Sequence, residues 1–162
     1  MSSDLEIKTN TQKFKYRVNG IIIKDNKLLT LRMKNKTSFC LPGGHVELGE
    51  DTHTAIIREM LEETDTDTTI SSELAIVESF YTDKNGLATH EISFYYIVEP
   101  VNYDKILLNN YTKIENDKNE VKKHNFEWIE LSKLNDVDFR PSYIKNKLTT
   151  GNLSFEHLIV KE

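Results

Sequence analysis

Apolar runs separated by turn residues predict two β-hairpins with one helix between them. One hairpin joins strands at 14–23 and 28–32, and the other joins strands at 73–81 and 89–98. The strands are rich in β-branched and aromatic residues, while Asp25-Asn26 and the segment 83–86 supply the turns. A run of strong helix formers predicts the helix at about 52–64.

The last third of the chain is less regular. Residues 101–125 are rich in Asn, Lys, Asp and Glu with little periodicity, which predicts a long loop rather than a linker between domains. The elements expected beyond it are a strand at 126–131, a helical turn capped by Ser132, a helix at 141–148 and a last strand at 155–160. Hairpins combined with two or more helices predict an α/β fold built on a mixed sheet.

The helix at about 52–64 is expected to have an acidic face and an apolar face. Asp51 and Thr52 are suitable capping residues, because a side-chain oxygen can accept hydrogen bonds from the N–H groups of the first turn. At about 100° per residue, three glutamates share one face: Glu59, Glu62 and Glu63. Three apolar residues point largely the other way, toward the expected core: Ile57, Met60 and Leu61.

The acidic face is expected to need a compensating cation. Like charges at i, i+4 cost an isolated helix roughly 0.2–0.5 kcal/mol per pair, and more when they are partly desolvated. Mg²⁺ is the natural candidate, since it prefers carboxylate, carbonyl and water oxygens, and no His/Cys set suggests zinc. Glu62-Glu63 alone would usually be a solvated helix face. The preceding Gly43-Gly44 turn, Glu50 and Arg58 favour a phosphate and metal site.

The segment 44–66 resembles the signature of the Nudix hydrolase family. That signature is Gly, five residues, Glu, seven residues, Arg-Glu, an apolar residue, any residue, Glu-Glu, any residue, Gly and an apolar residue. The matching positions are Gly44, Glu50, Arg58, Glu59, Met60, Glu62 and Glu63. Asp65 and Thr66 stand where the final glycine and apolar residue are usual. Asp65 is expected to end the helix in a left-handed conformation, at a cost of the order of 1 kcal/mol.

The resemblance covers about 14–148, because the flanking segments 41–44 and 126–129 also look like those of the family. It implies a single domain over 1–162 with a Nudix-type α/β/α sandwich, in which the signature helix packs on a central mixed sheet. It also implies Mg²⁺, with Mn²⁺ as an alternative, bound by the Gly44 carbonyl and the three helix glutamates. Glu120 lies where some relatives place a further ligand or base, and it is equally compatible with plain surface.

The activity that the resemblance implies is hydrolysis of the diphosphate bond in a nucleoside diphosphate linked to another moiety, by attack of water on phosphorus. Glu62 is favoured as the general base, while Glu50 and Arg58 are assigned to holding the loop and helix together, with Arg58 pairing Glu50 or Glu62. Gly43 and Gly44 let the backbone approach the substrate. Two alternatives stay open: a catalytically silent Nudix-like nucleotide-binding or sensor module, and a protein that uses the acidic helix structurally.

Aromatic residues are weaker candidates for substrate binding. In the strand 89–98, Phe94 and Tyr96 lie on one face and Tyr95 on the other, and one of these faces is expected to be core. Tyr81, Tyr95 and Tyr96 are candidates for stacking on a nucleobase, although aromatic residues in strands more often serve packing.

Composition limits the classes of partner and the cellular compartment that we expect for this protein. A net charge of −5 argues against a nucleic-acid duplex as partner, and no apolar run approaches 20 residues, which argues against a membrane span. The lone cysteine, Cys40, excludes an internal disulfide and agrees with a cytoplasmic protein. Cys40 is expected to be a small buried residue rather than a nucleophile. The expected partner is a small nucleotide or related diphosphate, and a homodimer is left open.

Overall fold

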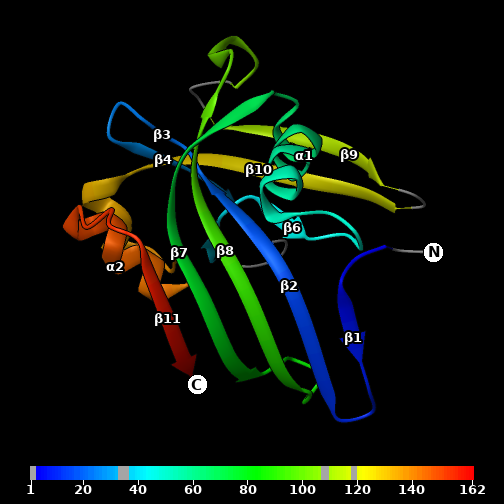
Figure 1. Ribbon diagram of the computed structural model, residues 1–162. Coiled ribbons are helices and arrows are strands. Elements are labelled where there is room, and N and C mark those ends of the chain that lie inside the picture. The colour runs from blue at the N-terminus through cyan, green and yellow to red at the C-terminus, as the bar shows by residue number, and fades with distance from the viewer. Residues whose placement is uncertain (1–2, 33–36, 107–109, 118–119) are drawn as a thin grey trace.

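The computed structural model describes residues 3–32, 37–106, 110–117 and 120–162, which form two β-sheets, two α-helices and two short 3-10 helices (Figure 1). The larger sheet contains β1 (Glu6–Lys8), β2 (Gln12–Ile21), β6 (Gly43–His45), β7 (Thr68–Thr82), β8 (Ala88–Pro100) and β11 (Glu156–Lys161). The smaller sheet contains β3 (Ile23–Lys24), β4 (Lys27–Arg32), β5 (Phe39–Cys40), β9 (Tyr111–Asp117) and β10 (Glu120–Glu130). The helices are α1 (Thr52–Thr64), α2 (Ser142–Thr150), η1 (Tyr103–Lys105) and η2 (Leu131–Asp136).

The larger sheet is mixed, as predicted. Its strands lie in the order β1-β2-β8-β7-β11, with β6 also pairing with β2. β2 runs parallel to β8 and β11 runs parallel to β7, while the other pairs are antiparallel. Because β6 pairs with the same edge of β2 as β1 does, the glycine turn is fixed on an edge of this sheet.

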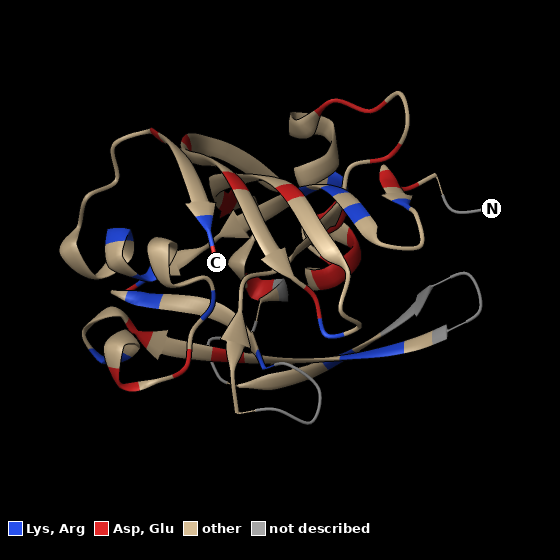
Figure 2. Ribbon diagram, turned by 90° about the horizontal axis from the view of Figure 1, so that it is seen from below, with Lys and Arg blue, Asp and Glu red and all other residues tan. Residues whose placement is uncertain are grey.

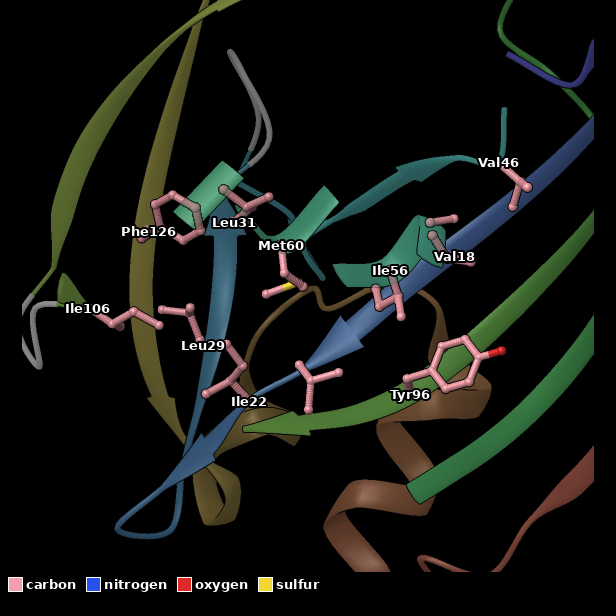
Figure 3. Close-up of a cluster of buried hydrophobic side chains, with 12 residues drawn as sticks. Val18, Ile22, Leu29, Leu31, Val46, Ile56, Met60, Tyr96, Ile106 and Phe126 are labelled. Carbon is pink, nitrogen blue, oxygen red and sulfur yellow. The ribbon is translucent and has the colours of Figure 1, made fainter. Parts of the chain in front are cut away.

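Both faces of the larger sheet are buried where β8 crosses its centre, so the expectation of one core face is wrong. Tyr96 is 1 % exposed and packs in a cluster with α1, whereas Tyr95 is 3 % exposed and packs in a second cluster with α2. Figure 3 shows the first cluster, with Ile56 and Met60 of α1 reaching between β2 and the strands of the smaller sheet. Helices on both faces confirm the predicted α/β/α arrangement.

α1 starts where the sequence predicts, but its core face is different. The Asp51 carboxylate accepts a hydrogen bond of 2.9 Å from the Thr54 N–H, which caps the helix. Ile56 and Met60 are fully buried, whereas Leu61 is 42 % exposed. The predicted core face is therefore wrong at two of its three positions, Ile57 and Leu61.

The reason for this error is that one face of α1 serves both packing and charge. Glu63 lies on the turn after Ile56 and Met60 at helical spacing, and it is only 8 % exposed. The buried face of α1 thus includes Glu63 together with Ile56 and Met60, and it does not lie opposite the glutamates. Ile57 lies about 100° away from Ile56 around the helix axis and is directed toward solvent.

Asp65 ends α1 as predicted. Its backbone is left-handed, with φ 58° and ψ 28°, and its N–H donates to the Leu61 carbonyl oxygen at 2.8 Å. This arrangement is the usual way in which a glycine closes a helix, and here an aspartate adopts it.

The segment 101–125 is not a long loop, and this prediction is wrong. β9 and β10 form an antiparallel hairpin in which Ile114 lies opposite Lys123 and Val121 opposite Asn116. Ile114 and Val121 are 62 % and 71 % exposed, so this face of the hairpin does not pack against a hydrophobic core. The alternation of apolar and polar residues that marks a half-buried strand is therefore missing from the sequence.

Elements are present near the other predicted positions with shifted boundaries, but two details are wrong. The strand expected at 14–23 is divided: β2 lies in the larger sheet and only β3 pairs with β4, so the first predicted hairpin is reduced to a very short one. Ser132 lies inside η2 and does not cap it, because η2 has no side-chain cap.

β1, β5 and β6 were not predicted because each is only two or three residues long. β7 and β8 extend beyond the predicted hairpin at both ends, and the last strand is present as β11. Among the described residues, no helix has the length and apolar character needed to cross a membrane.

The buried face of α1 can be tested by a matched pair of truncations. Met60→Ala is expected to lower the free energy of unfolding by about 2–5 kcal/mol, because it leaves a cavity among buried side chains. Leu61→Ala, at the next position of the same helix, is expected to change it by less than about 1 kcal/mol. Urea unfolding followed by circular dichroism measures both. Equal losses in the two variants would contradict the helix orientation.

The left-handed helix end predicts opposite effects of two substitutions at one position. Asp65→Gly is expected to raise the free energy of unfolding by about 0.5–1 kcal/mol, because glycine adopts this conformation without a side-chain clash. Asp65→Ala is expected to lower the free energy of unfolding by about 1 kcal/mol. Alanine has the same steric clash in the left-handed conformation, and it lacks the polar side chain that can offset the clash by local hydrogen bonding. The same urea measurement distinguishes them, and a destabilised Asp65→Gly variant would count against this cap.

Candidate active site

The glycine turn brings β6 against both β2 and α1. In the β2–β6 ladder, Gly43 lies opposite Asn19 and Gly44 opposite Val18. Gly43 has a φ of 149°, and a Cβ atom there would lie 2.2 Å from the Val18 carbonyl oxygen. A Cβ on Gly44 would lie 2.3 Å from the carboxylate of Glu59. Neither position has room for a side chain, so the two glycines permit the close approach of loop and helix.

Arg58 clamps the loop to the helix. Its Nε and Nη2 donate to the two carboxylate oxygens of Glu50 at 2.8 Å each, and Nη2 also donates to the His45 carbonyl oxygen at 3.0 Å. The hydrogen bonds from Arg58 hold the pKa of Glu50 below its ordinary value, and those with Glu50 raise the pKa of Arg58. The structure thus brings Arg58 and Glu50 together as the sequence suggested. Their paired hydrogen bonds hold the loop before α1 against the helix.

The three helix glutamates have different surroundings. Glu59 accepts from Arg58 Nη1 at 2.8 Å, and Glu62 accepts from the same nitrogen at 3.3 Å. Glu63 accepts a hydrogen bond of 2.9 Å from the Gly43 N–H. Burial raises the pKa of Glu59, although the hydrogen bond and charge of Arg58 oppose that rise. A cation beside Glu59 would favour its ionised form, which burial disfavours.

The oxygen atoms of these residues suit a hard divalent cation. The glutamates of α1, whose ribbon positions are red in Figure 2, and the Gly44 carbonyl offer oxygen atoms, which Mg²⁺ prefers as ligands. Among the described residues, no three His, Cys, Asp or Glu side chains are gathered closely enough to hold a metal ion by themselves. Mg²⁺ commonly binds through one or two carboxylates, with water and substrate phosphates completing its octahedron, so the residues present suit Mg²⁺ held jointly with a phosphate ligand.

The β9–β10 hairpin contacts the end of α1, which the sequence did not reveal. Lys113 Nζ on β9 donates to the Glu62 carbonyl oxygen at 2.6 Å, near the end of α1. A cation there also interacts favourably with the helix dipole. The contact was missed because 101–125 was interpreted as a loop, and no local pattern links Lys113 to α1. The side chain of Glu120, at the start of β10, lies outside the described residues.

Two candidate aromatic residues and the lone cysteine are not suited to binding or chemistry at the carboxylates. Tyr96 is 1 % exposed and shares a hydrogen bond of 2.7 Å with the Thr52 hydroxyl, so its ring is a core group and is not available for stacking on a nucleobase. Tyr81 donates to Glu91 at 2.9 Å on another part of the sheet. Burial raises the pKa of the Cys40 thiol to about 11, which agrees with an unreactive cysteine.

Sequence comparisons match this chain to known proteins. A family model described as NUDIX domain matches residues 13–147. An ADP-ribose pyrophosphatase from Methanocaldococcus jannaschii is 41 % identical over 87 residues, which are 52 % of this chain and 50 % of that protein. The chain therefore matches about half the length of this curated relative.

Solved structures show the same fold at low sequence identity. A NUDIX hydrolase from Nitrosomonas europaea superimposes with a TM-score of 0.58 at 17 % identity, covering 96 % of this chain and 82 % of that one. A MutT protein from Bacillus halodurans superimposes with a TM-score of 0.56 at 16 % identity, covering 88 % and 89 % of the two chains. Since the family model spans most of the residues and includes the glycine turn and the acidic helix, the chain belongs to the Nudix family.

Proposed function

We propose that the chain is a Mg²⁺-dependent pyrophosphohydrolase that cleaves the diphosphate bond of a nucleoside diphosphate linked to another moiety. The observation that carries this proposal is the fixed contact between the glycine turn and α1. Gly44 has no room for a side chain beside Glu59, and Gly43 donates to Glu63, so a backbone turn and two carboxylates share one small space. Such an arrangement suits a metal ion bound together with a phosphate group.

The proposed metal ligands are the Gly44 carbonyl and the carboxylates of Glu59, Glu62 and Glu63, with Glu120 as a further candidate. Mg²⁺ or Mn²⁺ bound there would neutralise charge on the diphosphate and orient water for in-line attack on phosphorus. Gly43 is proposed to let the substrate approach the backbone of the turn, and a Cβ atom there would meet the Val18 carbonyl oxygen of β2 at 2.2 Å.

Arg58 and Glu50 are proposed to position the loop rather than to touch the reacting atoms. Their two hydrogen bonds of 2.8 Å, together with the bond from Arg58 to the His45 carbonyl, fix the Gly44 carbonyl relative to α1. Precise placement of this kind supports catalysis because reacting groups must be held within a narrow range of distances.

Glu62 is proposed to accept the proton from the attacking water. Its side chain is 45 % exposed, compared with 13 % for that of Glu59, so water from solvent reaches it more readily. A base must lie within hydrogen-bond reach of the water that it activates.

ADP-ribose is the substrate to test first, because the curated relative is named for it. The experiment measures product release from ADP-ribose, nucleoside triphosphates, dinucleoside polyphosphates and nucleotide sugars, with Mg²⁺ and with chelator. Turnover that requires Mg²⁺ would support the proposal and identify the substrate class. Tight Mg²⁺-dependent binding without any turnover would instead favour a silent nucleotide-binding module.

The proposed ligands predict two inactive but folded variants. Glu59→Gln and Glu63→Gln are each expected to lower kcat about a hundredfold or more, because a neutral amide replaces a metal-binding carboxylate. Their melting temperatures should stay close to that of the parent, since an amide keeps the size of the side chain and can still accept a hydrogen bond. Steady-state kinetics and thermal unfolding measure the two effects separately.

Glu99→Gln is the matched control, because it changes an exposed glutamate on β8 by the same substitution. It should leave kcat unchanged. Unchanged kcat values in both Glu59→Gln and Glu63→Gln would contradict the assignment of the site.

A further inference from the structure

The carbonyl groups at the end of α1 accept hydrogen bonds from two different parts of the chain. The Met60 and Leu61 carbonyls accept from the last helical residue and from the cap residue that follows it. The next carbonyl, that of Glu62, accepts from Lys113 Nζ of β9 at 2.6 Å. The sequence of the last turn, Leu-Glu-Glu-Thr, holds no basic residue, so β9 supplies the cation that favours a helix C-terminus.

Lys113 lies on the inner face of the β9–β10 hairpin, which is the face that also carries Tyr111 and Phe126. The rings of Tyr111 and Phe126 stack with their centroids 4.9 Å apart, and both pack in the core cluster that contains α1. Lys113 follows Tyr111 by two residues and lies opposite His124, so strand alternation keeps it on the same face. Its contact with α1 agrees with this placement.

The outer face of the hairpin adds no apolar support. Ile114 and Val121 on that face are largely exposed. A two-stranded ribbon without a packed hydrophobic face is marginally stable by itself. A direct hydrogen bond to α1 therefore has a large influence on where the part of the hairpin beyond Tyr111 and Phe126 lies (Figure 1).

Lys113 contacts α1 at the residues that we propose for catalysis. Its partner carbonyl belongs to Glu62, the proposed base, and the next residue is Glu63, which accepts a hydrogen bond of 2.9 Å from the Gly43 N–H. Arg58 ties the same helix to the loop before it. The acidic part of α1 is thus tied to the loop by Arg58 and to the hairpin by Lys113.

A contact that fixes β9 also fixes β10. The two strands pair in an unbroken antiparallel register, from Tyr111 opposite Phe126 to Asp117 opposite Glu120. Glu120, the further candidate ligand, is the first residue of β10. The position of its backbone relative to α1 therefore depends on the angle at which the hairpin meets the helix.

We propose that Lys113 is a positioning residue of the active site, which holds the β9–β10 hairpin at a fixed distance from the glutamates of α1. This inference rests on the proposed function and adds to it a residue outside the family signature. A site whose parts are held in place before the metal ion binds loses less conformational entropy on binding, so it binds the ion more tightly. Release of the hairpin is expected to weaken metal binding for the same reason.

The kinetic test compares Lys113→Met and Lys113→Arg with Lys123→Met, which removes a lysine from the outer face of the same hairpin. With ADP-ribose as substrate, Lys113→Met is expected to raise the Mg²⁺ concentration for half-maximal rate about fivefold or more. Lys113→Arg keeps a cationic donor and should recover most of the loss, while Lys123→Met should match the parent. A value for Lys113→Met within about twofold of the parent would overturn the proposal.

Metal binding without substrate separates this proposal from the proposed function. Calorimetric titration with Mn²⁺ is expected to show about fivefold or more weaker binding to Lys113→Met than to the parent, and equal binding to Lys123→Met. Equal affinities of Lys113→Met and the parent would contradict the role of Lys113. A parent protein that binds Mn²⁺ but hydrolyses no substrate would contradict only the proposed function.

Hydrogen exchange and melting temperature distinguish positioning from a purely structural role. The backbone amides of β9 and β10 are expected to exchange faster in Lys113→Met than in the parent, because the hairpin is no longer tied to α1. Unchanged exchange in both strands would count against the proposal. A lower melting temperature combined with an unchanged Mn²⁺ affinity would show that Lys113 serves stability alone, which would also overturn it.

Discussion

The ion pair between Arg58 and Glu50 fixes the geometry on which the site depends. It joins α1 to the loop before it through two hydrogen bonds, and Arg58 adds a third to the His45 carbonyl on β6. The same guanidinium also bonds Glu59, so the clamp offsets part of the cost of burying that carboxylate. Loop, strand and helix are thereby held as one unit that contains Gly44 and the helix carboxylates.

Packing and charge compete for the same side of α1. Met60 is fully buried in the cluster of Figure 3, and Glu63 is 8 % exposed on the following turn. A buried carboxylate needs hydrogen bonds, and the Gly43 N–H supplies one to Glu63. Gly44 then has to lack a side chain because the Glu59 carboxylate fills the space beside it. The glycines are required here by what packs against them as well as by backbone conformation.

Short-range features of this protein followed from its sequence. The bounds of α1, its end at Asp65 and the Arg58–Glu50 pair depend on residues within a few turns of one another, so spacing and propensity were enough. The burial of Ile56 rather than Leu61 and the contact between Lys113 and the end of α1 depend on which distant segments cover each surface. Only the tertiary structure decided these, because burial and pairing arise between segments whose proximity no local pattern encodes.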